Sequence, residues 1–516
     1  MKALTDLWRH KPAAAAAVCI AALVALRLIV VVASPLEIGP DEAQYWRWSR
    51  TLDFGYYSKP PLIAWIIALS TGVFGNGEWA IRFFAPILHG VAAWFLFLLG
   101  RRAFDNRIGA WAAAIYLLMP GVWLSSTIMS TDAVLLPAWA AALYFLWRLR
   151  EQPKISNGAL AGAAIGLAML AKYAALYLFV GAGLAALFDR DMRRAIFSPA
   201  GVAAGIAALL VLSPNLLWNA ANGFATVSHT ADNANLGEAG FNPLHVFGFI
   251  GDQMAVFGPV TLVALFAGFG LIAGRKDKET TTRELWLLCF IVPPLVVILG
   301  QEIMSRAHAN WAATAYPAAC VLLASWIDRA FLGESRAKAA PFVKGGIGLN
   351  AVIGVLFAIV WVAPALGDAL GAANAFKRVR GWEQTADDLG ALALEHSATA
   401  LMFDEREVWH GVDYYGRDKP LPPIRAWRRT DHPRSHAEEA GAMQPGEDGR
   451  VIIASVRPDF RPRIRADFEA IEPLGTLTVP LGPKRSRQLK LYIASGYHPL
   501  ARTAEYEARF AGQKED

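Results

Sequence analysis

Long apolar runs separated by short polar segments make up the chain as far as about residue 366. A helix needs roughly 17 to 25 mostly apolar residues to cross about 30 Å of hydrocarbon. Eleven runs reach or approach that length, at residues 13–33, 80–100, 108–124, 132–147, 157–172, 173–188, 199–217, 246–273, 284–302, 309–327 and 346–366. The pattern predicts an α-helical polytopic membrane protein. We expect the first run to be retained as a signal anchor, because no small-residue cleavage site precedes Ser34-Pro35.

Basic residues are concentrated in every second loop between these runs. They are Arg101, Arg102 and Arg107; Arg148, Arg150 and Lys154; Arg190, Arg193 and Arg194; Arg275, Lys276 and Lys278; and Arg329, Arg336, Lys338 and Lys344. Because positively charged loops stay in the cytoplasm, these loops and the amino terminus are predicted to be cytoplasmic. The other loops, and everything after residue 366, are then external, which is the periplasm in a Gram-negative cell.

The stretch 157–188 contains Lys172-Tyr173 in the middle of 32 mostly apolar residues. Basic loops at both of its ends require an even number of crossings. We therefore expect two short helices that meet at an external Lys172, and not one long helix.

Composition agrees with a membrane protein and narrows its chemistry. The 516 residues are 55% hydrophobic and 18% charged, with a mean hydropathy of +0.34, which is too apolar for a soluble enzyme of this length. The net charge of +6 is accounted for by the sorted loops, so no nucleic-acid partner is predicted. The three cysteines all lie in apolar runs and indicate neither a disulfide framework nor a cysteine metal site.

From about residue 375 the chain becomes rich in charged residues and proline. Short apolar segments at 400–403, 451–456 and 489–494 predict strands, and 382–395 has a helical pattern. The sequence therefore predicts a transmembrane domain over 1–374, with a first external loop at 34–79, and an external α/β domain over 375–516.

The first external loop combines acidic, aromatic and basic residues. Asp41-Glu42 is predicted to begin a helix on the membrane surface, with Tyr45 and nearby tryptophans following, and Lys59 precedes two prolines. A structural alternative stays open, in which Asp41 is a helix N-cap, Glu42 a first-turn charge and Lys59 an interfacial cation.

Other ionisable residues are predicted at the same external side. Such groups are costly at membrane depth unless they are paired or functional, so a set of both signs at one face indicates an anion site with acid or base groups beside it. Singly, each also fits a capping or interfacial role. The set contains Asp132, Lys172, Glu302, Arg306 and His308.

Several short motifs occur in order through the membrane region. They are Asp41-Glu42, Tyr56-Tyr57-Ser58-Lys59-Pro60-Pro61-Leu62, Arg82, Ser130-Thr131-Asp132-Ala133, Gly166-Leu167-Ala168-Met169-Leu170-Ala171-Lys172, and His308-Ala309-Asn310-Trp311 with Ala315-Tyr316-Pro317. In order and spacing they resemble the bacterial branch of the protein O-mannosyltransferase superfamily, which includes the aminoarabinose transferases of lipid A. The C-terminal part matches only in position and α/β character.

The resemblance implies an inverting GT-C glycosyltransferase with about 11 to 13 transmembrane helices. Such an enzyme moves a sugar from a polyprenyl-phosphate donor to lipid A or lipopolysaccharide at the external face of the bacterial inner membrane. By analogy, the catalytic carboxylates are Asp41, Glu42 and Asp132; the donor phosphate is bound by Lys59, Lys172, Arg82 and Arg306; and the sugar or acceptor cavity contains Tyr45, Tyr57, His308 and Glu302.

Two questions stay open at this level. Many relatives have an acidic residue before the lysine, where this chain has Ser58, so a divalent metal is not assigned; the external candidates for its ligands are Asp41, Glu42, His229 and His245. The acceptor is the second question, because a protein O-mannosyltransferase-like enzyme would share the donor site. A secondary transporter is a further alternative, although two similar halves are not visible in the sequence.

Overall fold

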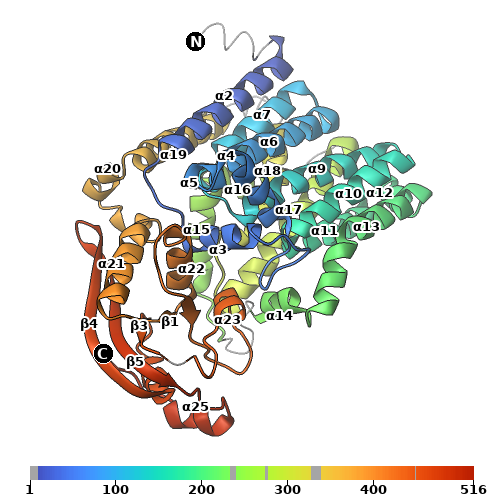
Figure 1. Cartoon of the computed structure of the whole chain (residues 1–516). Helices are drawn as coiled ribbons and strands as arrows, with labels where there is room; N and C mark the ends of the chain where they lie inside the picture. The colour runs from blue at the N-terminus through green and yellow to red at the C-terminus, as the bar shows by residue number, and fades with distance from the viewer. Residues whose placement is uncertain are drawn as a thin grey trace. The chain divides into compact units, whose positions relative to one another are not determined.

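The chain forms two compact units in the computed structural model (Figure 1), which describes residues 8–515 apart from Arg9, 233–239, 273–276, 327–338 and Asp448. The first, which we call the helical unit, contains Met1–Ala33 and Asp53–Ile359; the second, the sheet unit, contains Ser34–Leu52 and Val360–Asp516. The predicted first external loop at 34–79 is therefore divided between the two units. The domain boundary at residue 374 stays a prediction.

Helices account for the regular structure of the helical unit. They are α2 (Pro12–Ala33), α4 (Leu62–Phe74), α5 (Glu78–Arg82), α6 (Phe84–Ala103), α7 (Asn106–Leu118), α8 (Pro120–Ser125), α9 (Thr131–Glu151), α10 (Ile155–Ala171), η1 (Tyr173–Ala175), α11 (Leu176–Phe188), α12 (Arg190–Ile196), α13 (Pro199–Ala221), α14 (Ala225–Asp232), α15 (His245–Phe257), α16 (Pro259–Ile272), α17 (Lys278–Met304), η3 (Ala309–Ala315), α18 (Tyr316–Ser325) and α19 (Ala339–Val362), which ends in the sheet unit.

Six helices of the described residues are long and apolar enough to cross a membrane, or seven if α15 and α16, bent by 110°, form one span. Shorter apolar helices cover Leu62–Phe74, Ile155–Ala171 and Tyr173–Phe188. The chain is thus a multi-pass membrane protein, and each of the eleven predicted runs contains a helix. The count of eleven spans stays a prediction. Helix α4 was missed, because its 13 residues are fewer than a span requires.

Small residues let the helices of this unit approach closely. A Cβ atom on Gly158 or Gly162 of α10 would lie 1.9 or 2.0 Å from the carbonyl oxygen of Ala200 or Ala204 of α13, so these positions require glycine. This is the usual way in which membrane helices pack, since lipid provides no hydrophobic force between them. The outward residues of α13, such as Leu210 and Leu217, are large, apolar and exposed, as a lipid-facing surface requires.

Three of the basic loops meet at one end of this unit. Arg102 pairs with Glu151, Arg150 pairs with Asp189, and Arg283 donates to the carbonyl of Ala103 at 2.7 Å. The last residue of α9, Glu151, lies at that end, so Asp132 in the first turn lies at the opposite end of the helix. The shared end agrees with the prediction that these loops face one side. Other members of the basic set, Arg275, Lys276, Arg329, Arg336 and Lys338, lie outside the described residues.

The break predicted at Lys172 is confirmed. Helix α10 ends at Ala171, Lys172 adopts an extended backbone, and α11 begins at Leu176 after one 3-10 turn. The reason is local: a lysine and the polar ring of Tyr173 interrupt the apolar run at the point where the chain turns back.

The sheet unit has five strands in the order β2-β1-β3-β5-β4, with β1 parallel to both neighbours and β5 antiparallel to β3 and β4. Its elements are α3 (Pro40–Ser49), α20 (Pro364–Ala369), η5 (Ala373–Phe376), α21 (Trp382–Glu395), β1 (Ala400–Phe403), α22 (Arg406–Tyr415), β2 (Ile424–Ala426), α23 (His436–Gly441), β3 (Val451–Ser455), α24 (Arg461–Ala466), β4 (Phe468–Gly482), β5 (Arg485–Tyr497) and α25 (Ala504–Phe510). The predicted strands and helix are confirmed, and the unit has the predicted α/β character.

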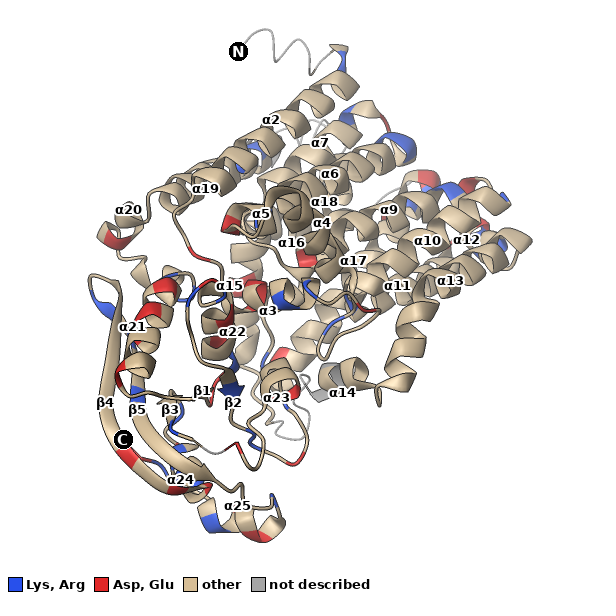
Figure 2. Ribbon diagram, in the orientation of Figure 1, with Lys and Arg blue, Asp and Glu red and all other residues tan. Residues whose placement is uncertain are grey.

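A buried apolar core stabilises this sheet. Met402, Ile453 and Tyr492 from three neighbouring strands pack with Trp427, and all four are buried. Charged residues are frequent around this unit, whereas the helices of the helical unit carry few along their length (Figure 2). The contrast follows the change of composition near residue 375 and is the one expected between a water-exposed unit and a membrane-spanning one.

Candidate active site

A cavity of about 340 Å³ lies in the helical unit. Its lining comes from segments far apart in the sequence: Ser58, Lys59, Pro60, Lys172, Tyr173, Ala174, Leu176, Tyr177, Ile298, Gln301 and Trp311. Within the described lining, the charged side chains are those of Lys59 and Lys172. The two lysines that the sequence analysis assigned to a donor phosphate therefore line one cavity, together with aromatic and apolar side chains.

Lys59 is presented by a tight turn. The backbone N–H of Tyr56 donates to the Lys59 carbonyl at 3.2 Å, and Pro60-Pro61 then leads directly into α4. Proline fixes one backbone angle at each of these two positions, so the exit of the chain from the turn is stiff. The lysine is thus held between two constrained segments at the cavity wall.

Lys172 reaches the cavity from the break between α10 and α11 and is paired with Asp132. Its ammonium lies 2.9 Å from Asp132 Oδ1, and the side-chain amide of Asn310 donates to Asp132 Oδ2. Both carboxylate oxygens thus have partners, and the exposed fractions of the Lys172 and Asp132 side chains are 19% and 7%. Pairing of this kind is what a low-dielectric environment requires.

Asp132 does not cap α9, although that alternative was open from sequence. The N-cap is Ser130, whose hydroxyl accepts from the Ala133 N–H at 3.3 Å, and Asp132 lies in the first turn. Its carboxylate is therefore left to bind Lys172 and Asn310. In the motif Ser130-Thr131-Asp132-Ala133, the Ser130 hydroxyl caps the helix and the Asp132 carboxylate orients the cavity lysine.

The end of α17 and the segment after it contribute Ile298, Gln301 and Trp311 to the cavity wall. The Glu302 carboxylate accepts from the Ala307 N–H at 2.5 Å, which closes the turn, and the ring of His308 lies edge-on to Trp311 with centroids 5.2 Å apart. Only Trp311 of these four is a cavity-lining residue within the described part of the chain. Glu302 and His308 are not in the described lining, and their contact with sugar or acceptor stays a prediction.

Other predicted phosphate and sugar residues are not in the described lining. Arg82 is buried at the end of α5, Arg306 is exposed, and neither lines the cavity. Tyr57 is half-buried, with its ring 5.3 Å from that of His229. Tyr45 belongs to the sheet unit, where it is buried and packs against Trp48 at 5.4 Å. The roles proposed for these residues stay predictions.

Helix α3, in the sheet unit, begins at Pro40 with Gly39 as its N-cap. The Glu42 carboxylate accepts from the Gly39 N–H at 2.9 Å, so Glu42 satisfies a backbone donor that the helix leaves unpaired. Asp41 is the second helical residue and does not cap. The helix expected to start at Asp41-Glu42 is confirmed, with Gly39 as the N-cap and Glu42 bonded back to it; its position on the membrane surface stays a prediction.

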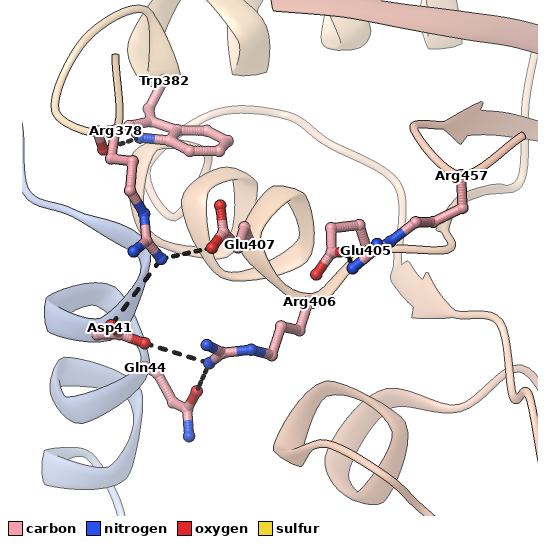
Figure 3. Close-up of polar contacts among 8 residues, drawn as sticks. All are labelled: Asp41, Gln44, Arg378, Trp382, Glu405, Arg406, Glu407 and Arg457. Atoms are coloured by element: carbon pink, nitrogen blue, oxygen red, sulfur yellow. Dashed lines mark hydrogen bonds and ion pairs between the residues drawn. The ribbon is translucent and has the colours of Figure 1, made fainter. Parts of the chain in front are cut away.

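The Asp41 carboxylate faces two arginines of the same unit (Figure 3). Arg406 Nη1 lies 3.2 Å from Asp41 Oδ1, and Arg378 Nη2 lies 3.9 Å from Asp41 Oδ2. Partial burial lowers the pKa of the Arg406 guanidinium, but the carboxylates of Asp41 and Glu407 outweigh that effect and raise it. Arg406 therefore stays protonated, and the Asp41 side chain remains about half exposed, at 49%.

The predicted metal candidates do not form a ligand set. Among the residues that the structure describes, no three or more His, Cys, Asp or Glu side chains are arranged to hold a metal ion. His245 Nδ1 lies 2.9 Å from the carbonyl oxygen of Glu302.

Comparison with known proteins decides the family. Residues 58–218 match the model of the dolichyl-phosphate-mannose-protein mannosyltransferase family. Lipid A galacturonosyltransferase RgtD of Rhizobium johnstonii is 34% identical over 420 residues, which are 80% of this chain and 85% of that protein. The chain belongs to the GT-C glycosyltransferases of the protein O-mannosyltransferase superfamily.

Other similarities agree with this glycosyltransferase family. Lipopolysaccharide core galacturonosyltransferase RgtA of the same organism is 27% identical over 205 residues, which are 39% of this chain and 41% of that protein. The crystal structure of ArnT from Cupriavidus metallidurans bound to undecaprenyl phosphate has a TM-score of 0.62, 15% identity, and coverage of 92% of this chain and 97% of that one. The predicted fold class and the resemblance are confirmed.

The structure also shows partners of the predicted site residues that the sequence analysis missed. Arg378 and Arg406, which contact Asp41, carry no local signal, since arginines are common throughout the C-terminal part. Asn310 was visible only as part of the motif His308-Ala309-Asn310-Trp311, and its bond to Asp132 joins positions 178 residues apart.

Proposed function

We propose that this glycosyltransferase moves a galacturonic acid residue from a polyprenyl-phosphate donor to lipid A. The observation that carries the proposal is the cavity with Lys59 and Lys172 in its wall. The chain that contains it is 34% identical to a lipid A galacturonosyltransferase over 80% of its length. Two ammonium groups suit an anionic sugar-phosphate head, and the apolar side chains beside them suit a lipid carrier.

The charge of the cavity suits an anionic donor head. In the lining as described, the ionisable side chains are two lysines and two tyrosines, and carboxylates are not among them. A donor that carries both a phosphate and a sugar carboxylate presents two anionic groups to this wall. The choice of a uronic acid over an amino sugar rests on the similarity to the lipid A galacturonosyltransferase, because Asp132 pairs with Lys172 and offsets part of the cationic charge of the wall.

The transfer needs a cation for the leaving group and a base for the acceptor. A hydroxyl oxygen of the acceptor attacks the anomeric carbon while the bond from that carbon to the phosphate oxygen breaks, and the electron pair leaves with the polyprenyl phosphate. Lys59 and Lys172 stabilise the negative charge that develops there. Asp41 takes the proton of the attacking hydroxyl. Attack opposite the leaving phosphate inverts the anomeric centre.

The acceptor and the sugar are tested together by mass spectrometry of lipid A from wild-type and deletion cells. We expect the deletion to remove the mass of one hexuronic acid from lipid A, and the reintroduced wild-type gene to restore it. Loss of a pentose or a neutral hexose would contradict the sugar. Unchanged lipid A with a sugar missing from envelope proteins would contradict the acceptor and favour the protein-modifying alternative.

We also propose that the enzyme resides in the bacterial inner membrane with its sheet unit in the periplasm. The support is the sorting of basic loops, three of which meet at one end of the helical unit. A periplasm-active reporter fused after Ala375 should be active, and one fused after Arg194 should be silent. An active reporter after Arg194 would reverse the orientation and the proposed side of the reaction.

A further inference from the structure

We propose that Arg406 is a positioning residue that fixes the orientation of the Asp41 carboxylate, so that the C-terminal region takes part in proton transfer. The inference rests on the base role of Asp41 in the proposed function. It concerns residues of the sheet unit alone, and all of the contacts that carry it lie within that unit (Figure 3).

Arg406 makes two contacts with one face of α3. Its Nη1 lies 3.2 Å from Asp41 Oδ1 and 2.9 Å from Gln44 Oε1. Asp41 and Gln44 are three residues apart and therefore neighbours on the helix surface. A guanidinium is planar and always charged, so one side chain that bonds to both positions restricts the torsions of the aspartate more than a flexible ammonium would.

Arg378 has a different relation to the same carboxylate. Its Nη2 is 3.9 Å from Asp41 Oδ2, which is beyond hydrogen-bond distance, and it forms an ion pair with Glu407. Because Glu407 neutralises the charge of Arg378, Arg378 does little to fix the orientation of the Asp41 carboxylate. Of these two arginines, Arg406 is the direct donor, and it holds one oxygen while the other is turned towards Arg378.

The two helices that carry these residues also make contact at the last turn of α22. The rings of Trp46 of α3 and Tyr414 of α22 meet edge to face at 5.0 Å, and Arg47 lies 3.6 Å from Asp413. The backbone N–H of Ile38, just before α3, donates to the Tyr415 hydroxyl at 2.7 Å. These contacts hold the last turn of α22 against α3, and Arg406 adds the contacts with Asp41 and Gln44 at the first turn.

Arg406 has two opposite effects on Asp41 as a base, one through its charge and one through orientation, and an experiment can separate them. A nearby guanidinium stabilises the ionised carboxylate and so weakens it as a base. If charge were the main effect, removing Arg406 would speed the reaction. If orientation is the main effect, removing Arg406 slows the reaction, because a misdirected base is not within hydrogen-bond reach of the hydroxyl proton.

The test is a double-mutant cycle on purified full-length enzyme with polyprenyl-phosphate galacturonic acid and lipid A. Arg406→Met should lower kcat about 10-fold or more and leave the KM of the donor unchanged, because the proposed donor contacts are made by Lys59 and Lys172. In the Asp41→Asn background, Arg406→Met should cause no further loss. Arg457→Met is the matched control: it breaks an ion pair with Glu405, the residue before Arg406, and should keep the wild-type kcat.

Arg406→Lys keeps the charge and is the second variant, in case Arg406→Met does not fold. We expect its kcat to lie between the kcat of wild type and that of Arg406→Met. In the Asp41→Asn background, Arg406→Lys should lower kcat no further. A wild-type or higher kcat for Arg406→Met overturns the positioning role. The positioning role is also overturned if Arg406→Met or Arg406→Lys lowers kcat by the same factor in the Asp41→Asn background as in the wild type. Normal turnover by Asp41→Asn alone would instead overturn the base role proposed above, which keeps the two failures apart.

Discussion

Asp41→Asn is expected to lower turnover by at least about 100-fold while leaving the protein folded. Asparagine keeps the size and much of the hydrogen bonding of aspartate but cannot accept the proton of an attacking hydroxyl. The start of α3 should survive, because Gly39 is its N-cap and the bond from Gly39 to the Glu42 carboxylate is untouched. The arginine pairs that are lost are half exposed, and such pairs contribute little to stability.

The measurement is single-turnover and steady-state transfer with purified enzyme, beside a thermal unfolding curve for each variant. Asp387→Asn is the matched control, because it makes the same chemical change in the same unit at an exposed carboxylate that pairs with Lys419. It should keep its rate. Near-normal turnover by Asp41→Asn, with folding unchanged, would leave Asp41 as a partner of the two arginines and remove it from the reaction.

The membrane part of this fold was predictable because a bilayer imposes a length on each crossing. Even the break at Lys172 followed from charge, since basic loops on both sides demanded a return of the chain. Helix α4 and the 110° bend between α15 and α16 did not follow. The helix is shorter than a span, and the bend depends on Gly258, whose φ of +97° lies in a region that other residues rarely adopt.

The site was predictable in part for a related reason. Lys59 and Lys172 were assigned to one face by counting crossings, and the structure places both in one cavity wall. The bond between Arg406 and Asp41 joins residues 365 positions apart. Periodicity and loop charge describe only neighbours along the chain, so they carry no information on which arginine of a charged domain meets an aspartate of an earlier loop.

Lys59→Met and Lys172→Met are each expected to reduce use of the polyprenyl-phosphate donor by about 10- to 100-fold. Methionine keeps much of the apolar stem and removes the charge, so a lysine that only extends towards water should tolerate the change. A charge-assisted bond to a phosphate is worth roughly 1.5 to 3 kcal/mol, which corresponds to that range. Both kcat and the KM of the donor should suffer, because the phosphate is bound before the reaction and gains charge during it.

The two lysines differ in what their removal leaves behind. Lys172→Met takes one partner from the Asp132 carboxylate, which is only 7% exposed, so part of its effect is a loss of stability. Adding Asp132→Asn removes the uncompensated charge and should restore the unfolding temperature without restoring donor use.

Lys154→Met, at the other end of α10 and exposed, controls for the loss of a lysine as such and should leave donor use unchanged. If donor affinity and turnover are unchanged in both Lys59→Met and Lys172→Met, the cavity does not bind the donor phosphate, and the leaving group must be stabilised elsewhere.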